Sequence, residues 1–334
     1  MKNKVTVDVF IPCYNNEKTL SKTLDSLLNQ SFKDMRITIV NNASTDKSLE
    51  VAESYQKRTP HIKIFSNPTN LGGEGNFNKC IELAEGKYTA IFHADDTYDK
   101  DIISKQVEAL ESHPELSVVL TQARMMNLQG KIVGQRFLPK ECRSTDISFL
   151  DFDSLFCLIL KYGNFLTCPS ALFSTVILKD KIKRWNGEMF GSSADLDIWL
   201  RLSQLSKVGL LSQPFMNYRI SDYSFSERLN RVRTHPHDFL KVLDFYYKKT
   251  NLDKRMELFY RFLHLKDQAF ILFNGIKRGE KVRYPKEKLT FIEILQITKA
   301  SLFHFKMMIK IYAILGFYKV LGNKASLVFK WINK

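Results

Sequence analysis

The stretch KYTAIFHADD, residues 87–96, decides the fold of this chain, because it joins a buried strand to two acidic side chains. Its apolar run from Tyr88 to Phe92 has the length of one strand, and Asp95 and Asp96 stand just beyond the end of that run. Adjacent like charges repel, so the pair is costly at a strand end without a counter-charge. The stretch therefore predicts a strand whose carboxyl end awaits a cation.

The chain before this stretch repeats the order of strand, polar loop and helix. Strand and helix alternate four times in about 90 residues, which predicts an α/β fold with a mainly parallel sheet flanked by helices. A further helix, a further strand and, past about residue 225, mainly helical patterns should follow. The expected strands cover 5–12 (ended by Pro12), 35–40, 62–67, 87–92 and 116–127, and the expected helices 15–32, 46–58, 74–86 and 101–115.

Polar clusters follow three of these strands. They are PCYNNE (12–17), NNASTD (41–46) and HADD (93–96). Ligands of open α/β sheets bind beyond the carboxyl ends of parallel strands, where these clusters would meet. The three clusters together predict a ligand site at this edge of the sheet.

Asp95 and Asp96 are hard oxygen ligands without a nearby cysteine, which favours Mn²⁺ or Mg²⁺ over zinc. Mg²⁺ commonly binds one or two carboxylates together with substrate phosphates. The alternative is a solvated turn in which Asp96 caps the next helix. The position after a strand and the two companion clusters favour the metal.

Composition and charge separate a near-neutral body from a basic end. The chain has 334 residues, 44% of them hydrophobic, and a net charge of +15. Residues 241–334 hold 20 Lys/Arg and 7 Asp/Glu, against 30 and 28 in residues 1–240. The five cysteines are odd in number and form no CxxC pair, which argues against a zinc ribbon and for a reducing, cytoplasmic compartment. The amino-terminal residues do not read as a signal peptide, and no segment reaches the roughly 18 apolar residues of a membrane span.

The ordered motifs resemble those of the family 2 glycosyltransferases, which have the GT-A fold. The similarity covers roughly residues 5–226 and is carried by VFIPCYNNEKTLSKTLDSLLNQSF (9–32), IVNNASTD (39–46), NLGGEGNFNKCIELAEGKY (70–88), FHADD (92–96), SADLDIWLRL (193–202) and YRISDYSFS (218–226). It implies transfer of a sugar from a nucleotide-sugar donor to an acceptor hydroxyl with inversion. It also implies a catalytic domain over 1–226, with a nucleotide part to about 127 and an acceptor-side part over 128–226, before a basic helical region over 227–334.

By this resemblance Asp96 coordinates the metal, and Asp95 contacts the ribose or the metal shell. Asn42 matches the position that faces the base, where its amide is able to pair with uracil or thymine, so UDP is favoured over dTDP. The alternative for Asn42 is an Asx-turn. Tyr14 is expected to stack on the base. The full nucleotide-binding set expected is Pro12, Tyr14, Asn15, Glu17, Asn42, Asn70, Gly72, Asn78 and Asp95.

Asp195 matches the general base of the family, the acidic residue ahead of the DIWLR helix. A carboxylate in that role takes the proton of the acceptor hydroxyl. Ala194 departs from the usual Glu-Asp pair, and Asp197 is the nearest competitor, two residues on and therefore on a different helix face. The alternative for Asp195 is a helix cap.

A second departure from the family pattern is Ser221, where many relatives have His against metal or phosphate. Serine cannot ligate a metal as imidazole does, so metal binding is expected to rely on Asp96 and the diphosphate. Arg219 is either a phosphate ligand or a surface residue. His93 is interpreted as a packing or hydrogen-bonding residue.

The basic end contains seven lysines and no acidic residue over 294–334. At helical spacing, Lys299, Lys306 and Lys310 fall on one face, opposite positions such as Met307 and Ile311. This pattern fits a helix lying on an anionic membrane surface, or a helix packed on the protein with its lysines in water. No nucleic-acid-binding motif accompanies the charge.

The main hypothesis is a metal-dependent transferase at the cytoplasmic face of a membrane, acting on a glycan or lipid-linked glycan in surface polysaccharide synthesis. A nucleotidyltransferase would carry a basic, Gly-rich loop after the first strand, and PCYNNE is not one. A nucleotide-sugar-binding protein on a decayed transferase fold is the non-enzymatic alternative, prompted by Ala194 and Ser221. The sequence does not identify the donor sugar or the oligomeric state.

Overall fold

The computed structural model describes residues 5–143, 146–220, 233–250, 253–278, 280, 283–285, 287–300 and 302–321. The chain forms two compact units. The first comprises Met1–Glu188 and Ala194–Ser221, and the second comprises Met189–Ser193 and Asp222–Lys334.

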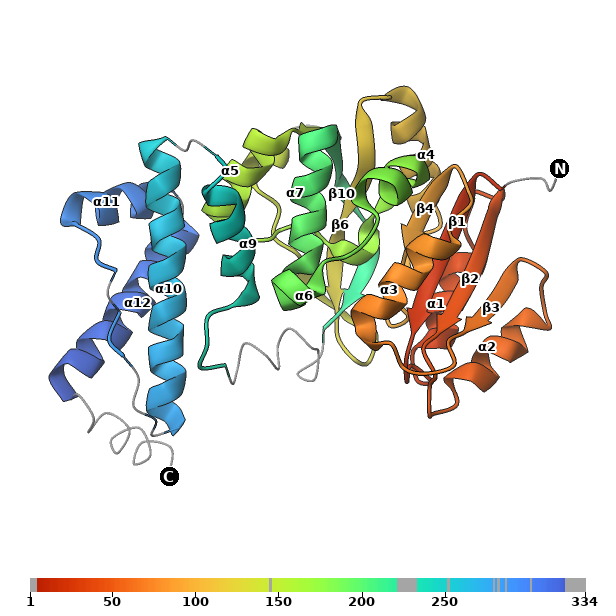
Figure 1. Ribbon diagram of the computed structural model, residues 1–334, viewed down its shortest axis with the longest axis horizontal. Helices are drawn as coiled ribbons and strands as arrows, with labels where there is room; N and C mark the ends of the chain where they lie inside the picture. Colours follow the sequence, from red (N-terminus) through yellow and green to blue (C-terminus); the bar gives the residue numbers. More distant parts are fainter. Residues whose placement is uncertain are drawn as a thin grey trace. The chain divides into compact units, whose positions relative to one another are not determined.

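The first four long strands of the first unit form the parallel block that the sequence predicts. They are β1 (Val7–Cys13), β2 (Met35–Asn41), β3 (Ile62–Ser66) and β4 (Tyr88–Ile91), and they lie in the order β3–β2–β1–β4, all parallel (Figure 1). Six of the seven residues of β1 are buried, as expected of a strand covered on both faces. This order brings the carboxyl ends of β1, β2 and β4 to one edge.

The strand β1 does not end at Pro12, contrary to expectation. Pro12 pairs in register with Val40 of β2, while the pairing with the short strand β4 ends at Phe10. A proline nitrogen cannot donate a hydrogen bond, and no strand neighbour lies beside it on the β4 side. A proline is therefore tolerated inside β1.

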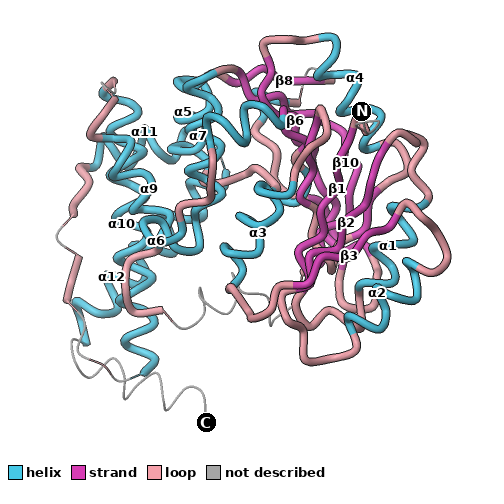
Figure 2. The backbone as a smooth tube through the Cα atoms, turned by 45° about the vertical axis from the view of Figure 1, so that its right-hand side comes forward, coloured by secondary structure: helices cyan, strands magenta, loops and turns pink. Residues whose placement is uncertain are grey.

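Helices cover both faces of this block. The helices α1 (Leu20–Leu28) and α2 (Ser48–Gln56) lie on one face and α3 (Gly72–Leu83) on the other (Figure 2). The side chains of Leu20, Leu24 and Leu27 of α1 are fully buried, which explains their spacing in the sequence. The helix expected from residue 15 begins only at Leu20, because the preceding residues bond another loop.

The rest of the unit contains the strand predicted over 116–127, observed as β6 (Leu116–Met126), and further strands that the sequence did not predict. The strand β9 inserts antiparallel between β4 and β6, and β10 pairs parallel with β6, so the whole sheet is mixed, with the order β3–β2–β1–β4–β9–β6–β10–β5. The strands are β5 (Thr97–Tyr98), β6 (Leu116–Met126), β7 (Ile132–Gln135), β8 (Ile147–Leu150), β9 (Leu172–Ser174) and β10 (Lys207–Arg219). The remaining helices and short helical turns are α4 (Ile102–Ser112), η1 (Lys140–Cys142), α5 (Phe152–Tyr162), η2 (Cys168–Ser170), η3 (Ile177–Ile182), α6 (Gly187–Phe190) and α7 (Ala194–Leu205). The short turn η4 (Gly191–Ser193) belongs to the second unit.

The described part of the second unit is helical, as the sequence predicts. Its helices are α9 (Asp238–Tyr247), α10 (Lys254–Arg278), α11 (Phe291–Ala300) and α12 (Leu302–Leu321). Apolar side chains of α10, α11 and α12 form a common core, and α12 contributes Met308, Ile311 and Leu315 at helical spacing. Among the described residues, no helix is both long enough and apolar enough to cross a membrane.

The lysines of the basic end do not share one helix. Lys299 lies in α11, whereas Lys306 and Lys310 lie in α12. Within α12 the expected separation holds in part: Lys306 and Lys310 are exposed and Ile311 is buried. The helix is a packed part of its unit.

Candidate active site

The loops after β1 and β2 hold each other in place at the carboxyl edge of the sheet. Asn15 has a φ of 54°, and its side chain donates to Thr45 Oγ1 (3.2 Å) and accepts from the Thr45 backbone N–H (2.9 Å). Glu17 accepts from the Lys47 N–H (3.1 Å) and its own N–H donates to Asp46 Oδ2 (3.0 Å). Asn15 and Glu17, expected to bind nucleotide, thus have structural partners, and their nucleotide contacts stay a prediction.

The side chain of Tyr14 in the same loop is 44% exposed. Its backbone N–H donates to Asn16 Oδ1 at 3.1 Å, while its ring has no ring partner among the described residues. An aromatic ring that stands free at the ligand edge of a sheet suits stacking on a planar base. The geometry is compatible with the expected role of Tyr14.

The amide of Asn42 is engaged on all sides. It donates to Asn70 Oδ1 (2.8 Å) and to the Gly72 carbonyl (3.1 Å), and it accepts from Asn67 Nδ2 and the Leu71 N–H, each at 3.0 Å. Asn42 is 2% exposed. In this arrangement it holds the 67–72 loop, and contact with a base requires that one of these bonds be exchanged.

Two further asparagines continue this network, and the sequence analysis did not single them out. Asn67 also donates to Asn76 Oδ1 (2.9 Å), and Asn76 donates to the Val40 carbonyl at the end of β2 (3.0 Å). Asn78 bonds both backbone groups of Trp185, donating to the carbonyl (3.4 Å) and accepting from the N–H (2.8 Å). These amides fix α3 to its surroundings.

Gly72 begins α3 with a φ of 73°, and a Cβ there would meet no atom within 4 Å. Its backbone angle requires glycine, because other L residues rarely adopt a positive φ. The surrounding space would admit a larger side chain. The same open space leaves the start of α3 accessible to a ligand, as the sequence analysis expects.

The acidic pair after β4 forms the most polar buried point of the edge. Asp96 is 1% exposed, and its Oδ1 accepts the backbone N–H of Arg219 at 2.7 Å. Its Oδ2 is buried without a hydrogen-bond partner among the described residues, and so is Nε2 of His93. Burial and, next, the charge of Asp95 raise the pKa of Asp96 well above its usual value.

These residues fit a divalent cation. Ligand atoms of His93, Asp95 and Asp96 lie within 4.8 Å of one another, and His93 Nδ1 is 4.0 Å from Asp96 Oδ2. Burial lowers the pKa of His93, which favours the neutral imidazole that ligates metals. The ring also packs edge-on against Phe77 (centroids 5.5 Å apart), as the sequence interpretation expects. An unpartnered buried carboxylate oxygen beside a second carboxylate is the donor set of a Mn²⁺ or Mg²⁺ site.

Arg219 is a buried residue that holds backbone carbonyls, not a surface residue. It is 5% exposed, and its guanidinium donates to the carbonyls of Asp95 (2.7 Å), Asn127 (3.0 Å) and Leu128 (3.2 Å). It fastens the acidic loop to the β6–β7 turn, so the reading as a surface residue is wrong, while a phosphate contact stays a prediction. Ser221 lies outside the described residues.

Asp195 and Asp197 of α7 differ in their partners. Asp195 accepts the Leu196 N–H (2.8 Å) and Asn164 Nδ2 (3.2 Å), and burial raises its pKa. Asp197 is 2% exposed and forms an ion pair with Arg201 (2.8 Å). Arg201 also donates to two backbone carbonyls, at residues 182 and 184, so its pair with Asp197 is part of the packing. Of these two carboxylates, Asp195 is the one that forms no ion pair among the described residues.

Four residues link the acidic pair to Asp195, and the sequence analysis proposed none of them as a site residue: Arg136, Asn164, Cys168 and Tyr218. The charges of both Asp195 and Asp96 raise the pKa of the Cys168 thiol, after the larger effect of its burial. Burial and the charge of Asp96 likewise raise the pKa of Tyr218 to about 12. The charges of both carboxylates therefore act on Cys168. No strand-end motif marks these four residues, which come from separate segments.

Comparison with protein families identifies the chain. The family model for glycosyl transferase family 2 matches residues 8–160. Over these residues the chain is similar to glycosyl transferase family 2. The match contains the acidic pair and the three polar loops of the carboxyl edge, and the recognition made from the motifs is confirmed.

Individual relatives agree with this assignment. An uncharacterized glycosyltransferase of Methanocaldococcus jannaschii is 27% identical over 72% of this chain and 80% of its own length. The poly(ribitol-phosphate) beta-N-acetylglucosaminyltransferase TarS of Staphylococcus aureus is 22% identical over 70% of this chain and 39% of its own length.

Solved structures confirm the GT-A glycosyltransferase fold. Residues 1–349 of TarS, in complex with UDP-GlcNAc, superpose with a TM-score of 0.59 at 18% identity, over 97% of this chain and 88% of that chain. The mannosyltransferase PcManGT of Pyrobaculum calidifontis, in complex with GDP-Man and Mn²⁺, gives 0.55 at 14% identity, over 100% and 89%. At these identities the similarity concerns the fold alone. The roles of individual residues are therefore argued from the geometry of the site.

Proposed function

We propose that this transferase uses Mn²⁺ or Mg²⁺ to move a sugar from a UDP-sugar to an acceptor hydroxyl, with inversion at the anomeric carbon. The observation that carries the proposal is the buried oxygen Oδ2 of Asp96, which has no hydrogen-bond partner among the described residues and lies beside Asp95. The charges of Asp96 and of Asp195 in α7 also both act on Cys168. A donor held at the acidic pair and an acceptor hydroxyl held at Asp195 would meet between these carboxylates. The catalytic part lies within residues 1–226.

Asp195 is the proposed base. Its Oδ2 is bonded by Asn164, which fixes the direction of the carboxylate, and its raised pKa brings it closer to the pKa that suits a general base. Asp195 takes the proton from the acceptor hydroxyl as that oxygen attacks the anomeric carbon from the side opposite the diphosphate. Attack from that side inverts the configuration.

Asp96 and Asp95 would hold the metal, with His93 beside them. When bound, the metal supplies positive charge to the diphosphate that leaves the sugar. The Arg219 N–H holds one oxygen of Asp96, so the carboxylate presents the other oxygen in a fixed direction. The same contact keeps the acidic loop against the end of β10.

The donor base is proposed to be uracil, with thymine second. Tyr14 offers an exposed ring, and Asn42, once released from Asn70 or Gly72, offers one donor and one acceptor to the uracil edge. The structural relatives bind UDP-GlcNAc in one case and GDP-Man in the other, so this fold accommodates either base. The choice of uracil therefore rests on the side chains of this chain.

The test is a panel of nucleotide sugars with and without Mn²⁺. The melting temperature should rise most with a UDP-sugar plus Mn²⁺, and the same sugar should be consumed with release of UDP. EDTA should abolish both. Binding without any turnover would favour a non-enzymatic sugar-nucleotide-binding protein, and no response to any nucleotide sugar would refute the proposal.

We further propose that the acceptor is a glycan or lipid-linked glycan of surface polysaccharide synthesis on the cytoplasmic side. The relative TarS is named for a polymer acceptor, poly(ribitol-phosphate). All five cysteines are free in this structure, which suits a reducing compartment.

The second unit is proposed to lie on an anionic membrane surface. Its helices expose lysines together with large apolar side chains: Lys299, Lys306, Lys310, Lys319, Phe291, Ile292, Leu295, Phe305, Ile309, Tyr312 and Val320. Such mixed faces bind anionic lipid through apolar burial and charge together.

Vesicle sedimentation tests this placement. The full chain should sediment with anionic vesicles at low salt and be released near 0.5 M salt, where the screening length falls to a few ångströms. Lys306→Glu with Lys310→Glu should abolish sedimentation. The matched control is Lys18→Glu with Lys57→Glu, two exposed lysines of the first unit that give the same net charge. Equal behaviour of the two double variants would refute this part.

A further inference from the structure

The arginines near the acidic pair differ in how their guanidinium groups are used. Arg219 donates to three carbonyls, and Arg124 donates to Asp99, Asn217 and the Pro214 carbonyl. Arg136 makes one long side-chain hydrogen bond, from Nη2 to the Asn164 carbonyl at 3.5 Å. A guanidinium has five N–H donors, so most donors of the half-buried Arg136 have no acceptor among the described residues.

Arg136 is also fixed in place. Its backbone N–H donates to the Ala123 carbonyl (2.9 Å), and its own carbonyl accepts from Gln122 Nε2 (3.0 Å), so it is anchored to β6. Its guanidinium carbon lies 5.4 Å from the ring centroid of Tyr218. The unused donors therefore belong to a positioned side chain.

The neighbours of Arg136 place it between the two halves of the active site. Asn164, which it contacts on one side, donates to Asp195. Tyr218, which it contacts on the other side, precedes the residue whose N–H holds Asp96. Its positive charge acts on both carboxylates, yet among the described residues it forms no ion pair with either, whereas Arg201 pairs directly with Asp197. Arg136 therefore does not serve as the ion-pair partner of either carboxylate.

We propose that Arg136 binds a phosphate group of the bound substrates, through its planar fork of N–H donors, in the space between Asp96 and Asp195. This rests on the proposed function. Guanidinium groups match phosphate oxygens two at a time, and such charge-assisted bonds are strong. The phosphate belongs either to the donor diphosphate or to a phosphate-bearing acceptor, and the experiment separates these sources.

The experiment compares Arg136→Met with Arg136→Lys, which keeps the charge and loses the fork, and with Arg143→Met as control. Arg143 is exposed, lies on the same connection and donates to the Leu138 carbonyl (2.9 Å). Calorimetry in Mn²⁺ measures the binding of UDP and UMP, and then of inorganic phosphate to the UDP-saturated protein. The melting temperature of each variant shows whether it is folded.

If the donor diphosphate is the ligand, Arg136→Met weakens UDP binding by about 10- to 100-fold, weakens UMP binding less, and Arg136→Lys falls between. If the ligand is an acceptor phosphate, UDP binding stays at the wild-type level and inorganic phosphate no longer binds to the UDP-loaded variant. Should Arg136→Met not fold, Arg136→Lys carries the same comparison.

Wild-type behaviour of both Arg136 variants in both measurements would overturn the inference and leave the proposed function untouched. A wild-type protein that binds no uridine nucleotide in Mn²⁺ would overturn both. Equal losses in Arg136→Met and Arg143→Met would also count against the inference, because they would trace the effect to the connecting segment as a whole.

Discussion

Two aspartates at opposite ends of the sheet are equally buried and differently bonded. Asp8 near the start of β1 and Asp96 after β4 are each 1% exposed. Asp8 accepts Arg36 Nε at 2.9 Å and Nη2 at 3.1 Å, and the backbone N–H groups of Glu85 and Gly86 at 2.8 and 2.7 Å. Asp96 has one partner for one oxygen and none, among the described residues, for the other.

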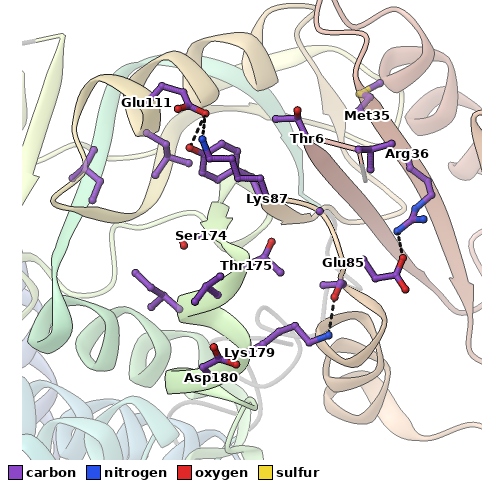
Figure 3. Close-up of a pocket in the computed structure, with 18 of the residues that line it drawn as sticks. Thr6, Met35, Arg36, Glu85, Lys87, Glu111, Ser174, Thr175, Lys179 and Asp180 are labelled. Atoms are coloured by element: carbon purple, nitrogen blue, oxygen red, sulfur yellow. Dashed lines mark hydrogen bonds and ion pairs between the residues drawn. The ribbon is translucent and has the colours of Figure 1, made fainter. Parts of the chain in front are cut away.

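The surroundings of Asp8 show the same saturation. A hollow of about 1580 Å³ lies at that amino end of the strands, and several of its charged side chains are paired (Figure 3). Lys87 pairs with Glu111 (2.6 Å), and Lys179 donates to the Ala84 carbonyl (2.7 Å). The size of a hollow therefore does not locate the chemistry of this molecule. The unpaired buried oxygen of Asp96 does, because such a group is costly unless a ligand completes it.

The largest effect is expected at Asp96. Asp96→Ala removes both carboxylate oxygens and should abolish sugar transfer while the chain stays folded. EDTA should reproduce the loss in the wild type, because the proposed metal and the carboxylate act together. Turnover is measured as UDP release, and folding by circular dichroism. Full activity of the wild type in EDTA would remove the metal from the mechanism.

The next largest effect is expected at Asp195. Asp195→Asn keeps the size and most hydrogen bonding of the side chain but cannot take a proton. Transfer should fall by a factor on the order of 10²–10⁴ with UDP-sugar binding preserved. The matched control is Asp197→Asn, which should chiefly lower the melting temperature by weakening the pair with Arg201. Normal turnover in Asp195→Asn with loss in Asp197→Asn would reverse the assignment.

The strands and the acidic pair were predictable because they depend on local sequence. Buried parallel strands are short apolar runs, and the carboxyl ends of parallel strands meet whatever the details of packing. The insertion of β9 between β4 and β6 was not predictable, since pairing partners distant in the chain leave no local pattern. The same reason hid Arg136 and Asn164.

The sequence does not show the tertiary partners of its candidate residues. Arg219 was read as a surface residue or a phosphate ligand, and in the structure it is buried and donates to three backbone carbonyls. Asn42 matches a base-contacting position, but here its amide is part of an asparagine network with Asn67 and Asn70. A motif gives the residue type, and only tertiary contacts show which of its donors and acceptors remain free.

Asp8 should show the opposite behaviour to Asp96. Asp8→Ala removes the acceptor of four hydrogen bonds and leaves the Arg36 guanidinium and two N–H groups without it. Loss of about 2–4 kcal/mol of stability is expected, or roughly 4–16 °C in melting temperature, with nucleotide affinity unchanged in the folded fraction. A stable variant with lost UDP binding would show that the amino end takes part in function.

A smaller effect should appear in the pH profile. Because burial raises the pKa of Asp195, the base becomes protonated at a higher pH than an exposed aspartate would. Transfer should therefore decline as the pH falls through this raised pKa, well before an ordinary aspartate titrates. The profile of kcat/KM measures it. A rate that stays flat down to pH 4 would exclude Asp195 as the base.

The smallest effect, and the sharpest test of the contrast with Asp8, is the stability of Asp96→Asn without metal. The folded pKa of Asp96 is raised, by burial first and then by Asp95, so the folded state binds this proton more tightly than the unfolded state does. The stabilisation from the protonated form is thus present at low pH and is lost as the pH rises through the folded pKa. The ionised carboxylate therefore destabilises the folded state at neutral pH.

Asparagine cannot ionise, and its carbonyl is able to accept the Arg219 N–H in place of the carboxylate. In EDTA at neutral pH, Asp96→Asn should therefore melt on the order of 2–4 °C above the wild type, the shift that about 1 kcal/mol produces in a domain of this size. Added Mn²⁺ should raise the melting temperature of the wild type but not that of Asp96→Asn, so that the wild type becomes the more stable of the two. A fall in melting temperature in EDTA would mean that Asp96 is already satisfied, as Asp8 is, and the distinction between the two ends of the sheet would not hold.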